Sequence, residues 1–438
     1  MQPKQILDLN AFQPATTAVR DPAVQALIER RIANLGPASV LFYDEPLHIV
    51  RGEGVGLVAA DGRRYLDVYN NVPSVGHCHP RVVDAIARQA AVLNVHNRYL
   101  SEITERYVER LKALLPRSLA NIALTCSGSE ANDLALRLAR HATGNTGVIV
   151  TSTAYHGNTA AVIEISPSAF KHAQLPAHIR AVPPPGSAHY GADIATGFAA
   201  AVEAAATALD AAGHGVAALV CDSIFSSDGV FAEPRGLLAP AVAVVRHAGG
   251  LYIADEVQPG FARTGEAFWG FTRHGLEPDM VTMGKPMGNG FPTAGLATRP
   301  DLMAPYFADF GYFNTFGGTP VAAAAGLAVL DVIADERLQE NALSTGSYLK
   351  ERLEALATTR PAINAVRGVG LFLGVSLARR GVPDAALVRR VINGLRQRGI
   401  LIGAAGRHGD VLKIRPPLPF QPEHVDQLAG ALAEALDV

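Results

Sequence analysis

Short β-rich runs alternate with helical patterns through the middle of this 438-residue chain. The expected strands cover 122–125, 147–151, 217–222, 250–254 and 280–283, and the clearest expected helices cover 129–141, 240–248 and 320–334. Such alternation favours βαβ units around a mostly parallel sheet that helices cover on both faces. The chain is therefore expected to fold as an α/β protein, in which ligands bind at the carboxyl ends of the strands.

The C-terminal part carries a different pattern, with a helix, a strand and two further helices expected over 338–358, 366–375, 384–399 and from Pro422 onward. We expect residues 336–438 to form a smaller α+β domain. The N-terminal segment 1–75, with a hairpin-like stretch at 54–67, is expected to join it. Residues 76–335 then form the large domain.

Composition argues against several classes of protein. Hydrophobic residues make up 49% and charged residues 18% of the chain, as in ordinary soluble globular proteins. The net charge of −2 gives no field that would attract nucleic acid or an acidic membrane. No apolar run reaches the roughly 18 residues that span a bilayer. We therefore expect neither a nucleic-acid nor a membrane partner.

The N-terminal residues and the cysteines indicate the cellular compartment of the protein. The first ten residues contain no long apolar segment, so we expect no signal peptide. The three cysteines, Cys78, Cys126 and Cys221, are widely spaced, which argues against a disulfide framework and against a zinc site. The sequence therefore predicts a cytoplasmic protein without a bound metal.

Lys285 and Asp255 suggest the chemistry. Lys285 follows an expected strand and lies among glycines in the segment 283–290 (MGKPMGNG), where its amine can meet a carbonyl. Asp255 ends another apolar run and can hold a cationic ring nitrogen. Together they suggest pyridoxal phosphate, with Lys285 as the Schiff-base lysine and Asp255 as the partner of the pyridinium nitrogen. Alternatively, Lys285 is a solvated surface lysine and Asp255 pairs with a structural cation.

Five residues can surround that cofactor. Gly128 and Ser129 stand where a strand meets a helix, so a phosphate can bind there, although Ser129 can also be a plain helix cap. Tyr155 can stack on one ring face, or belong to a half-buried core. Val257 can cover the other face, and Gln258 can reach the phenolic oxygen of the ring.

Thr315 and Arg415 are weaker candidates. Thr315 lies in a glycine-rich loop and can donate to a phosphate oxygen, but the loop can also be only the entry of the helix that begins near Pro320. Arg415 precedes two prolines, and an arginine fork suits a carboxylate, although a structural salt bridge explains it equally well.

Several motifs in one order resemble a known family. The segments 52–54 (GEG), 65–67 (YLD), 76–80 (GHCHP), 127–131 (SGSEA) and 255–258 (DEVQ) resemble the class III pyridoxal-phosphate aminotransferases of fold type I. The resemblance covers residues 52–420. It implies a large domain with a mostly parallel seven-stranded sheet, a smaller α+β domain, and a homodimer with shared active sites.

The resemblance also assigns roles. Thr315 would contact the phosphate bound by the other subunit, while Gly128 and Ser129 contact that of their own. Arg415 would match the arginine that takes an α-carboxylate in ornithine-type members. Pocket shape would depend on the N-terminal segment, including Phe42 and Tyr43, and Tyr43 is our candidate there for substrate binding.

A narrower similarity leaves two outcomes open. The segments 70–72 (NNV), 284–290 (GKPMGNG) and 411–417 (VLKIRPP) are similar to a subgroup of alanine–glyoxylate-type aminotransferases and ethanolamine-phosphate phospho-lyases. One departure matters: many class III enzymes carry Glu-Pro-x-Gln-Gly-Glu where this chain has 222–227 (DSIFSS). Since Ser227 replaces the second glutamate, which can pair with the carboxylate-binding arginine, we hypothesise that Arg415 stays available for a carboxylate.

The leading functional hypothesis is an aminotransferase that moves an amino group from an amino acid or amine to a keto acid by a ping-pong mechanism through Lys285. The alternative is a phospho-lyase, which would need a second phosphate site to which Arg98 or Arg263 can contribute. A non-catalytic binding protein is disfavoured because both Lys285 and Asp255 are present.

Overall fold

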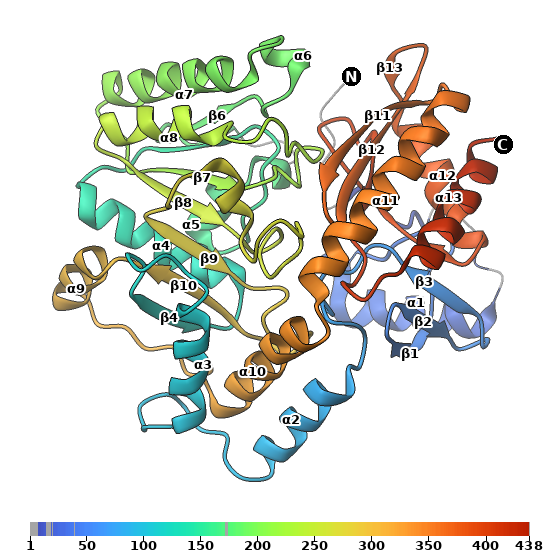
Figure 1. Ribbon diagram of the computed structural model, residues 1–438, viewed down its shortest axis with the longest axis horizontal. Helices are drawn as coiled ribbons and strands as arrows, with labels where there is room; N and C mark the ends of the chain where they lie inside the picture. The colour runs from blue at the N-terminus through green and yellow to red at the C-terminus, as the bar shows by residue number, and fades with distance from the viewer. Residues whose placement is uncertain (1–7, 15–18, 20, 39, 171–173, 438) are drawn as a thin grey trace.

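The computed structural model describes residues 8–14, 19, 21–38, 40–170 and 174–437. A large sheet with its helices lies on one side of the molecule, and the C-terminal elements lie on the other together with the strands of the N-terminal segment (Figure 1). The N-terminal residues 1–7, part of the stretch in which no signal peptide was expected, lie outside the described residues.

The large sheet has seven strands in the order β4-β10-β9-β8-β7-β5-β6. Only β10 runs antiparallel to its neighbours. Their bounds are β4 (Asn121–Thr125), β5 (Val148–Thr151), β6 (Ile179–Val182), β7 (Ala218–Asp222), β8 (Leu251–Asp255), β9 (Met280–Met283) and β10 (Ala294–Thr298). The expected mostly parallel sheet is confirmed, and all five expected strands exist with ends within one residue of the prediction. β6 and β10 were not predicted.

Helices cover both faces of this sheet. Alternate residues of one strand enter two separate hydrophobic clusters, since successive side chains point to opposite faces. Leu219 and Cys221 of β7 pack with α7 and α8, whereas Ala218 and Val220 pack with α4 and α9. The helices of this part are α4 (Gly128–Thr143), α5 (Ala160–Glu164), α6 (Ser187–Tyr190), α7 (Ile194–Ala211), α8 (Leu238–His247) and α9 (Pro300–Asp309), with the short 3-10 helices η3 (Pro167–Ala169) and η4 (Gly270–His274).

By length and apolar composition, one helix among the described residues, α7, could cross a membrane. Its Phe198, Val202 and Leu209 are buried, and the helix packs on α8 and β6. Glu203 interrupts its apolar residues, so the sequence contains no unbroken apolar run here. Packing within the helical layer accounts for its composition.

The C-terminal part builds an antiparallel sheet in the order β11-β12-β16-β15, with β13 paired to β12. Its elements are β11 (Ile363–Val369), β12 (Phe372–Arg379), β13 (Val382–Pro383), β15 (Gly403–Ala405), β16 (Val411–Ile414), α11 (Leu338–Thr359), α12 (Ala385–Gln397) and α13 (Pro422–Leu436). The three expected helices are confirmed, but the single strand expected over 366–375 is wrong. Gly370 has a positive φ of 57° and turns the chain there, so the run belongs to two paired strands.

The N-terminal segment pairs with the C-terminal part. Strands β1 (Ile49–Glu53), β2 (Gly56–Ala59) and β3 (Arg64–Asp67) form a sheet that β14 (Ile400–Leu401) completes in parallel with β3. The helices α1 (Pro22–Leu35) and η2 (Gly36–Ala38) precede these strands. The three-part division 1–75, 76–335 and 336–438 stays a prediction, and part of its first segment lies outside the described residues.

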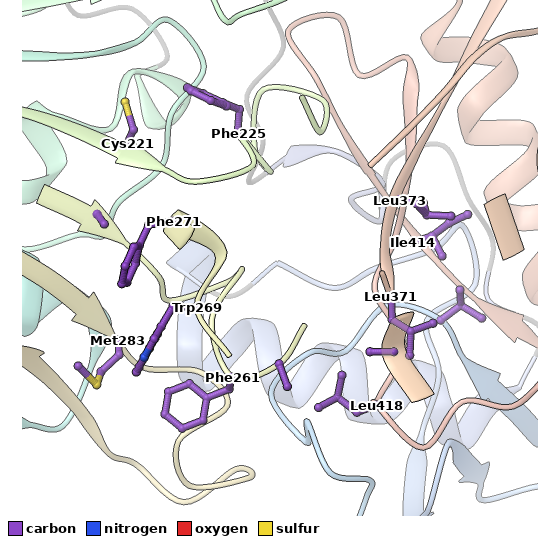
Figure 2. Packing of buried hydrophobic residues seen from close by; sticks show 14 of the residues in the cluster. Cys221, Phe225, Phe261, Trp269, Phe271, Met283, Leu371, Leu373, Ile414 and Leu418 are labelled. Carbon is purple, nitrogen blue, oxygen red and sulfur yellow. The ribbon is translucent and has the colours of Figure 1, made fainter. Parts of the chain in front are cut away.

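Three helices and a shared core link the two sides. Helices α2 (Pro80–Ala90) and α3 (Glu102–Lys112) pack on α10 (Pro320–Asp335), which is buried along most of its length. Figure 2 shows Trp269 and Met283 of the large part and Leu371 and Leu418 of the C-terminal part in one hydrophobic cluster. This continuous core fixes the position of one side against the other.

We predict that Gly346→Ala lowers the free energy of unfolding by about 1–3 kcal/mol, because a Cβ at Gly346 of α11 would overlap the backbone of Gly370. Gly430 of α13 is the matched control, since a Cβ there meets no atom within 4 Å. Gly430→Ala should leave stability unchanged or raise it by up to about 1 kcal/mol. Urea denaturation measures both variants, and equal effects would contradict the packing argument.

Candidate active site

A cavity of about 380 Å³ opens at the carboxyl ends of the parallel strands. Seven of the candidate residues line it: Gly128, Ser129, Tyr155, Asp255, Val257, Gln258 and Lys285. The cavity is further lined by Val72, Cys126, Ser127, His156, Gly157, Asp222, Gly284 and the segment 290–293. One pocket therefore combines residues separated by more than two hundred positions in the sequence.

The start of α4 forms one end of this cavity. Ser127, not Ser129, caps the helix: its hydroxyl accepts from the N–H of Glu130, and the Glu130 carboxylate accepts from the N–H groups of Ser127 and Cys126. Within the described part of the chain, no acceptor takes the N–H groups of Gly128 and Ser129. Those two donors and the positive end of the helix dipole suit an anion.

Two glycines allow the chain to pass close to this helix end. A Cβ at Gly128 would lie 2.8 Å from a methyl carbon of Val257, so a larger residue there would have to displace the Val257 side chain. A Cβ at Gly157 would lie 2.5 Å from Oγ of Ser129. That oxygen accepts from the N–H of Asn158 at 3.2 Å, so the hydroxyl hydrogen of Ser129 stays available to a ligand.

Asp255 ends β8 and is 5% exposed. Its Oδ1 accepts from the N–H of Val257 at 3.1 Å, and its Oδ2 accepts from Nδ2 of Asn132 at 3.1 Å. The same Oδ2 lies 2.6 Å from Nδ1 of His156. The amide of Asn132, the backbone N–H of Val257 and the imidazole of His156 thus hold the carboxylate. They take the place of the structural Arg or Lys considered from the sequence.

His156 and Asn132 are site residues that the sequence analysis missed. Asn132 also donates to the carbonyl of His156, and its own Oδ1 accepts from the hydroxyl of Thr282 on β9. His156 directly follows the ring-stacking candidate Tyr155, and this adjacency was the available signal. Its partner Asp255 lies 99 residues away, so the pairing could not be seen in the sequence.

Lys285 follows β9 and reaches the cavity from a turn. Burial, first, and the neighbouring charge of Arg415 lower the pKa of its amine to about 8, while the carboxylates of Asp255 and Asp222 oppose the shift. A lysine with this pKa is partly uncharged near neutral pH, as a nucleophilic amine must be.

Gln258, which lines the cavity, belongs to a chain of hydrogen bonds that extends from Asp222 to Asn71. The hydroxyl of Ser226 donates to Asp222 and accepts from Nε2 of Gln258 at 2.7 Å. Oε1 of Gln258 then accepts from Nη1 of Arg415, which also donates to Oδ1 of Asn71 at 3.1 Å. The guanidinium stacks on a tyrosine ring, with its central carbon 4.5 Å from the ring centre of Tyr69.

Tyr43, Thr315 and Arg415 do not line the cavity of their own chain, although Arg415 bonds to Gln258, which does. Tyr43 is buried, and its hydroxyl lies 3.3 Å from the carbonyl oxygen of Ile402, to which it donates. Thr315 is exposed on the loop before α10. Their expected roles therefore stay predictions.

The two basic residues considered for a second phosphate are placed differently. Arg98 is exposed, and its guanidinium lies 3.9 Å from the ring centre of Phe313. Arg263 is 1% exposed and donates to the carbonyl oxygens of Leu371 and Pro416. Because these carbonyls occupy Arg263, it is poorly placed to bind a further anion.

The cavity fits pyridoxal phosphate. Two free N–H groups at the start of α4 suit its phosphate, and the buried carboxylate of Asp255 suits a protonated ring nitrogen. Tyr155 and Val257 offer flat and apolar surface for the ring, and Lys285 offers the amine.

We predict that His156→Phe weakens the binding of pyridoxal phosphate about ten- to a hundredfold, because Asp255 loses a donor and hydrogen bonds to charged groups contribute about 1.5–3 kcal/mol. His178→Phe is the control, since His178 also pairs with a carboxylate, Glu164, but does not line the cavity. Equilibrium dialysis of the cofactor-free proteins gives the dissociation constants. An unchanged constant for His156→Phe would refute the supporting role of His156.

Comparison with known proteins agrees with this geometry. Residues 42–436 match the family Aminotransferase class-III. The chain is 38% identical to the Drosophila melanogaster protein named alanine–glyoxylate aminotransferase 2-like, over 93% of this chain and 86% of that protein. It is 36% identical to ethanolamine-phosphate phospho-lyase homolog 1 of Caenorhabditis elegans, over 97% and 96% of the two chains.

A solved structure is also similar. A phospholyase from Arthrobacter in complex with phosphoethanolamine superimposes with a TM-score of 0.91, at 45% identity, over 94% of this chain and 99% of that chain. The resemblance and fold inferred from the sequence are thereby confirmed. Because the family match covers nearly the whole length, the chain belongs to the class III aminotransferases, which use pyridoxal phosphate.

Proposed function

We propose that this enzyme transfers an amino group from an amino acid or amine to a keto acid, with Lys285 as the catalytic base. One observation carries the proposal. The Lys285 amine, whose pKa is lowered to about 8, lines the same cavity as the buried carboxylate of Asp255 and the free N–H groups of Gly128 and Ser129. This reaction requires three things of the protein: an amine, a carboxylate that binds the ring nitrogen, and backbone donors that bind the phosphate.

The residues that would hold the cofactor follow from their chemistry. Gly128 and Ser129 would hold the phosphate, and Asp255 would hold the ring nitrogen. Tyr155 and Val257 would cover the two ring faces. When bound, pyridoxal phosphate supplies an aldehyde that takes the amino group and a ring that withdraws electrons from the reacting carbon.

Lys285 would transfer the proton during the reaction. Its Nζ would take the proton from the reacting carbon of the amino donor and would hold it for return to the other carbon bonded to the transferred nitrogen. Burial keeps water from competing for that proton, and Asn132, His156 and the N–H of Val257 hold the carboxylate of Asp255 in place. Arg415 would bind the carboxylate of an amino-acid donor or a keto-acid acceptor.

A homodimer is part of the proposal. The segment 310–316, which contains Thr315, exposes three phenylalanines: Phe310, Phe313 and Phe316, with Phe316 70% exposed. Leu100, on the loop after α2, is 97% exposed. Exposed apolar side chains of this size mark protein–protein contacts. A second copy bound there would bring Thr315 towards the partner's phosphate.

A phospho-lyase is the second candidate, and one observation favours it. The similar Arthrobacter structure is described as a phospholyase in complex with phosphoethanolamine, and the identity of 45% is higher than with the two named relatives. The same cavity can serve both outcomes, because both begin with the removal of a proton by Lys285. The two differ in whether a phosphate leaves.

We expect amino transfer to appear when amino donors are tested with pyruvate, 2-oxoglutarate and glyoxylate, because Arg415, which bonds to the cavity residue Gln258, would bind a carboxylate. Lys285→Ala should reduce the rate about a thousandfold or more, whereas Lys112→Ala, at an exposed lysine of α3, should not. Phosphate release is followed in parallel. Release from phosphoethanolamine without any keto acid would replace the transferase proposal with the lyase.

Cofactor attachment should depend on pH in a defined direction. Only an uncharged amine attacks an aldehyde, so the rate at which pyridoxal phosphate attaches to cofactor-free protein should rise with pH and level off above the Lys285 pKa of about 8. An ordinary lysine, with a pKa of about 10.4, would give a rate that keeps rising. Stopped-flow absorbance from about pH 6 to 10 measures this, with Lys285→Arg as the inert control. A rise that continues to pH 10 would contradict the lowered pKa.

A further inference from the structure

Two buried donors beside the cavity have no acceptor among the residues that the structure describes. They are Nδ2 of Asn71 and Nε of Arg415. Asn71 is 2% exposed and Arg415 is 8% exposed, so bulk water does not compensate either group. A buried donor without a partner costs about 1–3 kcal/mol, so such groups call for an acceptor that binds later.

The other contacts of these side chains fix their orientation. Oδ1 of Asn71 accepts from Nη1 of Arg415 at 3.1 Å, and turning the amide over would set two donors against each other. The amide nitrogen of Asn71 therefore stays free. Gln258 holds Nη1 from the cavity side, and Tyr69 supports the guanidinium from its face.

No carboxylate among the described residues bonds to the Arg415 side chain. Asp67 accepts from the N–H groups of Tyr69 and Asn70 and pairs with His77. Asp222 accepts from the N–H of Ile224 and from Ser226. The nearby acids are thus engaged elsewhere, and the positive charge of Arg415 keeps two neutral oxygen partners.

The free donors lie close to the cavity. Val72, the residue after Asn71, lines it, and so does Gln258, which bonds directly to Arg415. Burial is the main cause of the lowered pKa of Lys285, and the charge of Arg415 lowers that pKa further, so the two side chains lie near each other. An anion bound by the pair would therefore lie within reach of the reacting amine.

We propose that Asn71 is a specificity-determining residue, whose amide nitrogen joins Nε of Arg415 in binding the anionic group of the substrate. The inference rests on the proposed function and narrows its substrate class to amines that carry a carboxylate or a phosphate. A simple neutral amine leaves both donors unsatisfied, which lowers its affinity relative to an anionic amine. Carboxylate and phosphate oxygens are alike as acceptors, so the probe must separate them.

The experiment uses two probes without an amino group. Propionate presents the carboxylate, ethyl phosphate presents the phosphate, and neither can react. Calorimetric titration of the cofactor-saturated enzyme gives a dissociation constant for each. Asn71→Leu removes the free donor at nearly constant volume, and Asn71→Ala is measured beside it in case the larger side chain prevents folding.

Two control variants distinguish the loss of a hydrogen-bond donor to the anion from the loss of a contact that holds Arg415 in place. Gln258→Leu removes the other oxygen that accepts from Nη1 of Arg415 but no free donor, because Nε2 of Gln258 is bonded to Ser226. Asn70→Leu makes the same change one residue away, at a half-buried side chain. Melting temperatures show that each variant is folded.

We expect Asn71→Leu to weaken at least one probe about ten- to a hundredfold, Gln258→Leu to weaken it less than about threefold, and Asn70→Leu to leave it unchanged. A loss for propionate alone assigns the subsite to carboxylates, and a loss for ethyl phosphate alone assigns it to phosphates. Three results would overturn the proposal: no binding of either probe to the unaltered enzyme, unchanged binding by Asn71→Leu, or an equal loss for Gln258→Leu.

These outcomes are independent of the proposed reaction, because binding is measured without turnover. An enzyme that binds a probe through Asn71 but transfers no amino group to any keto acid would refute the transferase and keep the subsite. An active transferase whose dissociation constants for the probes do not change when Asn71 is substituted would refute the subsite alone.

Discussion

The site depends on two carboxylates that the parallel strands bring side by side. Asp222 and Asp255 are paired neighbours at the ends of β7 and β8, both largely buried. Like charges at this separation in a low-dielectric place are unfavourable unless donors or cations compensate them. Hydrogen bonds meet part of this need, and the two buried lysines Lys285 and Lys413 interact favourably with the carboxylates. The strand register thus places two negative charges where a buried lysine side chain is energetically favourable.

The cationic side of the site comes from the C-terminal part of the chain. Arg415 follows β16, and its backbone N–H donates to the carbonyl of Val68, next to β3. Arg263 of the large part donates to Pro416 and thereby ties the two parts together at this point. The shared hydrophobic core continues across the same boundary (Figure 2) and holds Arg415 against Gln258, while no carboxylate among the described residues pairs with it.

Local sequence patterns predicted the main strands and helices of this structure. They did not predict the contacts between residues far apart in the sequence. The strands β7, β8 and β9 are buried on both faces, so their continuous apolar runs were visible in the sequence. The same rule failed at 366–375, where an apolar run conceals a turn at Gly370. Ser127 and Ser129 are both plausible caps by residue type, and only the bond to Glu130 distinguishes them. The support of Asp255 by His156 depends on a contact across 99 residues, which no local pattern encodes.

The neutral partners of Arg415 bear on how a substrate anion enters. If a buried glutamate held the guanidinium, an incoming carboxylate would first have to break an ion pair, and removing one partner of such a pair costs about 3–5 kcal/mol. Here Arg415 is held by the amide oxygens of Gln258 and Asn71, which leave its charge uncompensated. An anion then adds to the existing contacts instead of displacing one. Because Ser227 stands where many class III enzymes carry a glutamate, the described part of the chain supplies no carboxylate that an incoming anion would have to displace from Arg415.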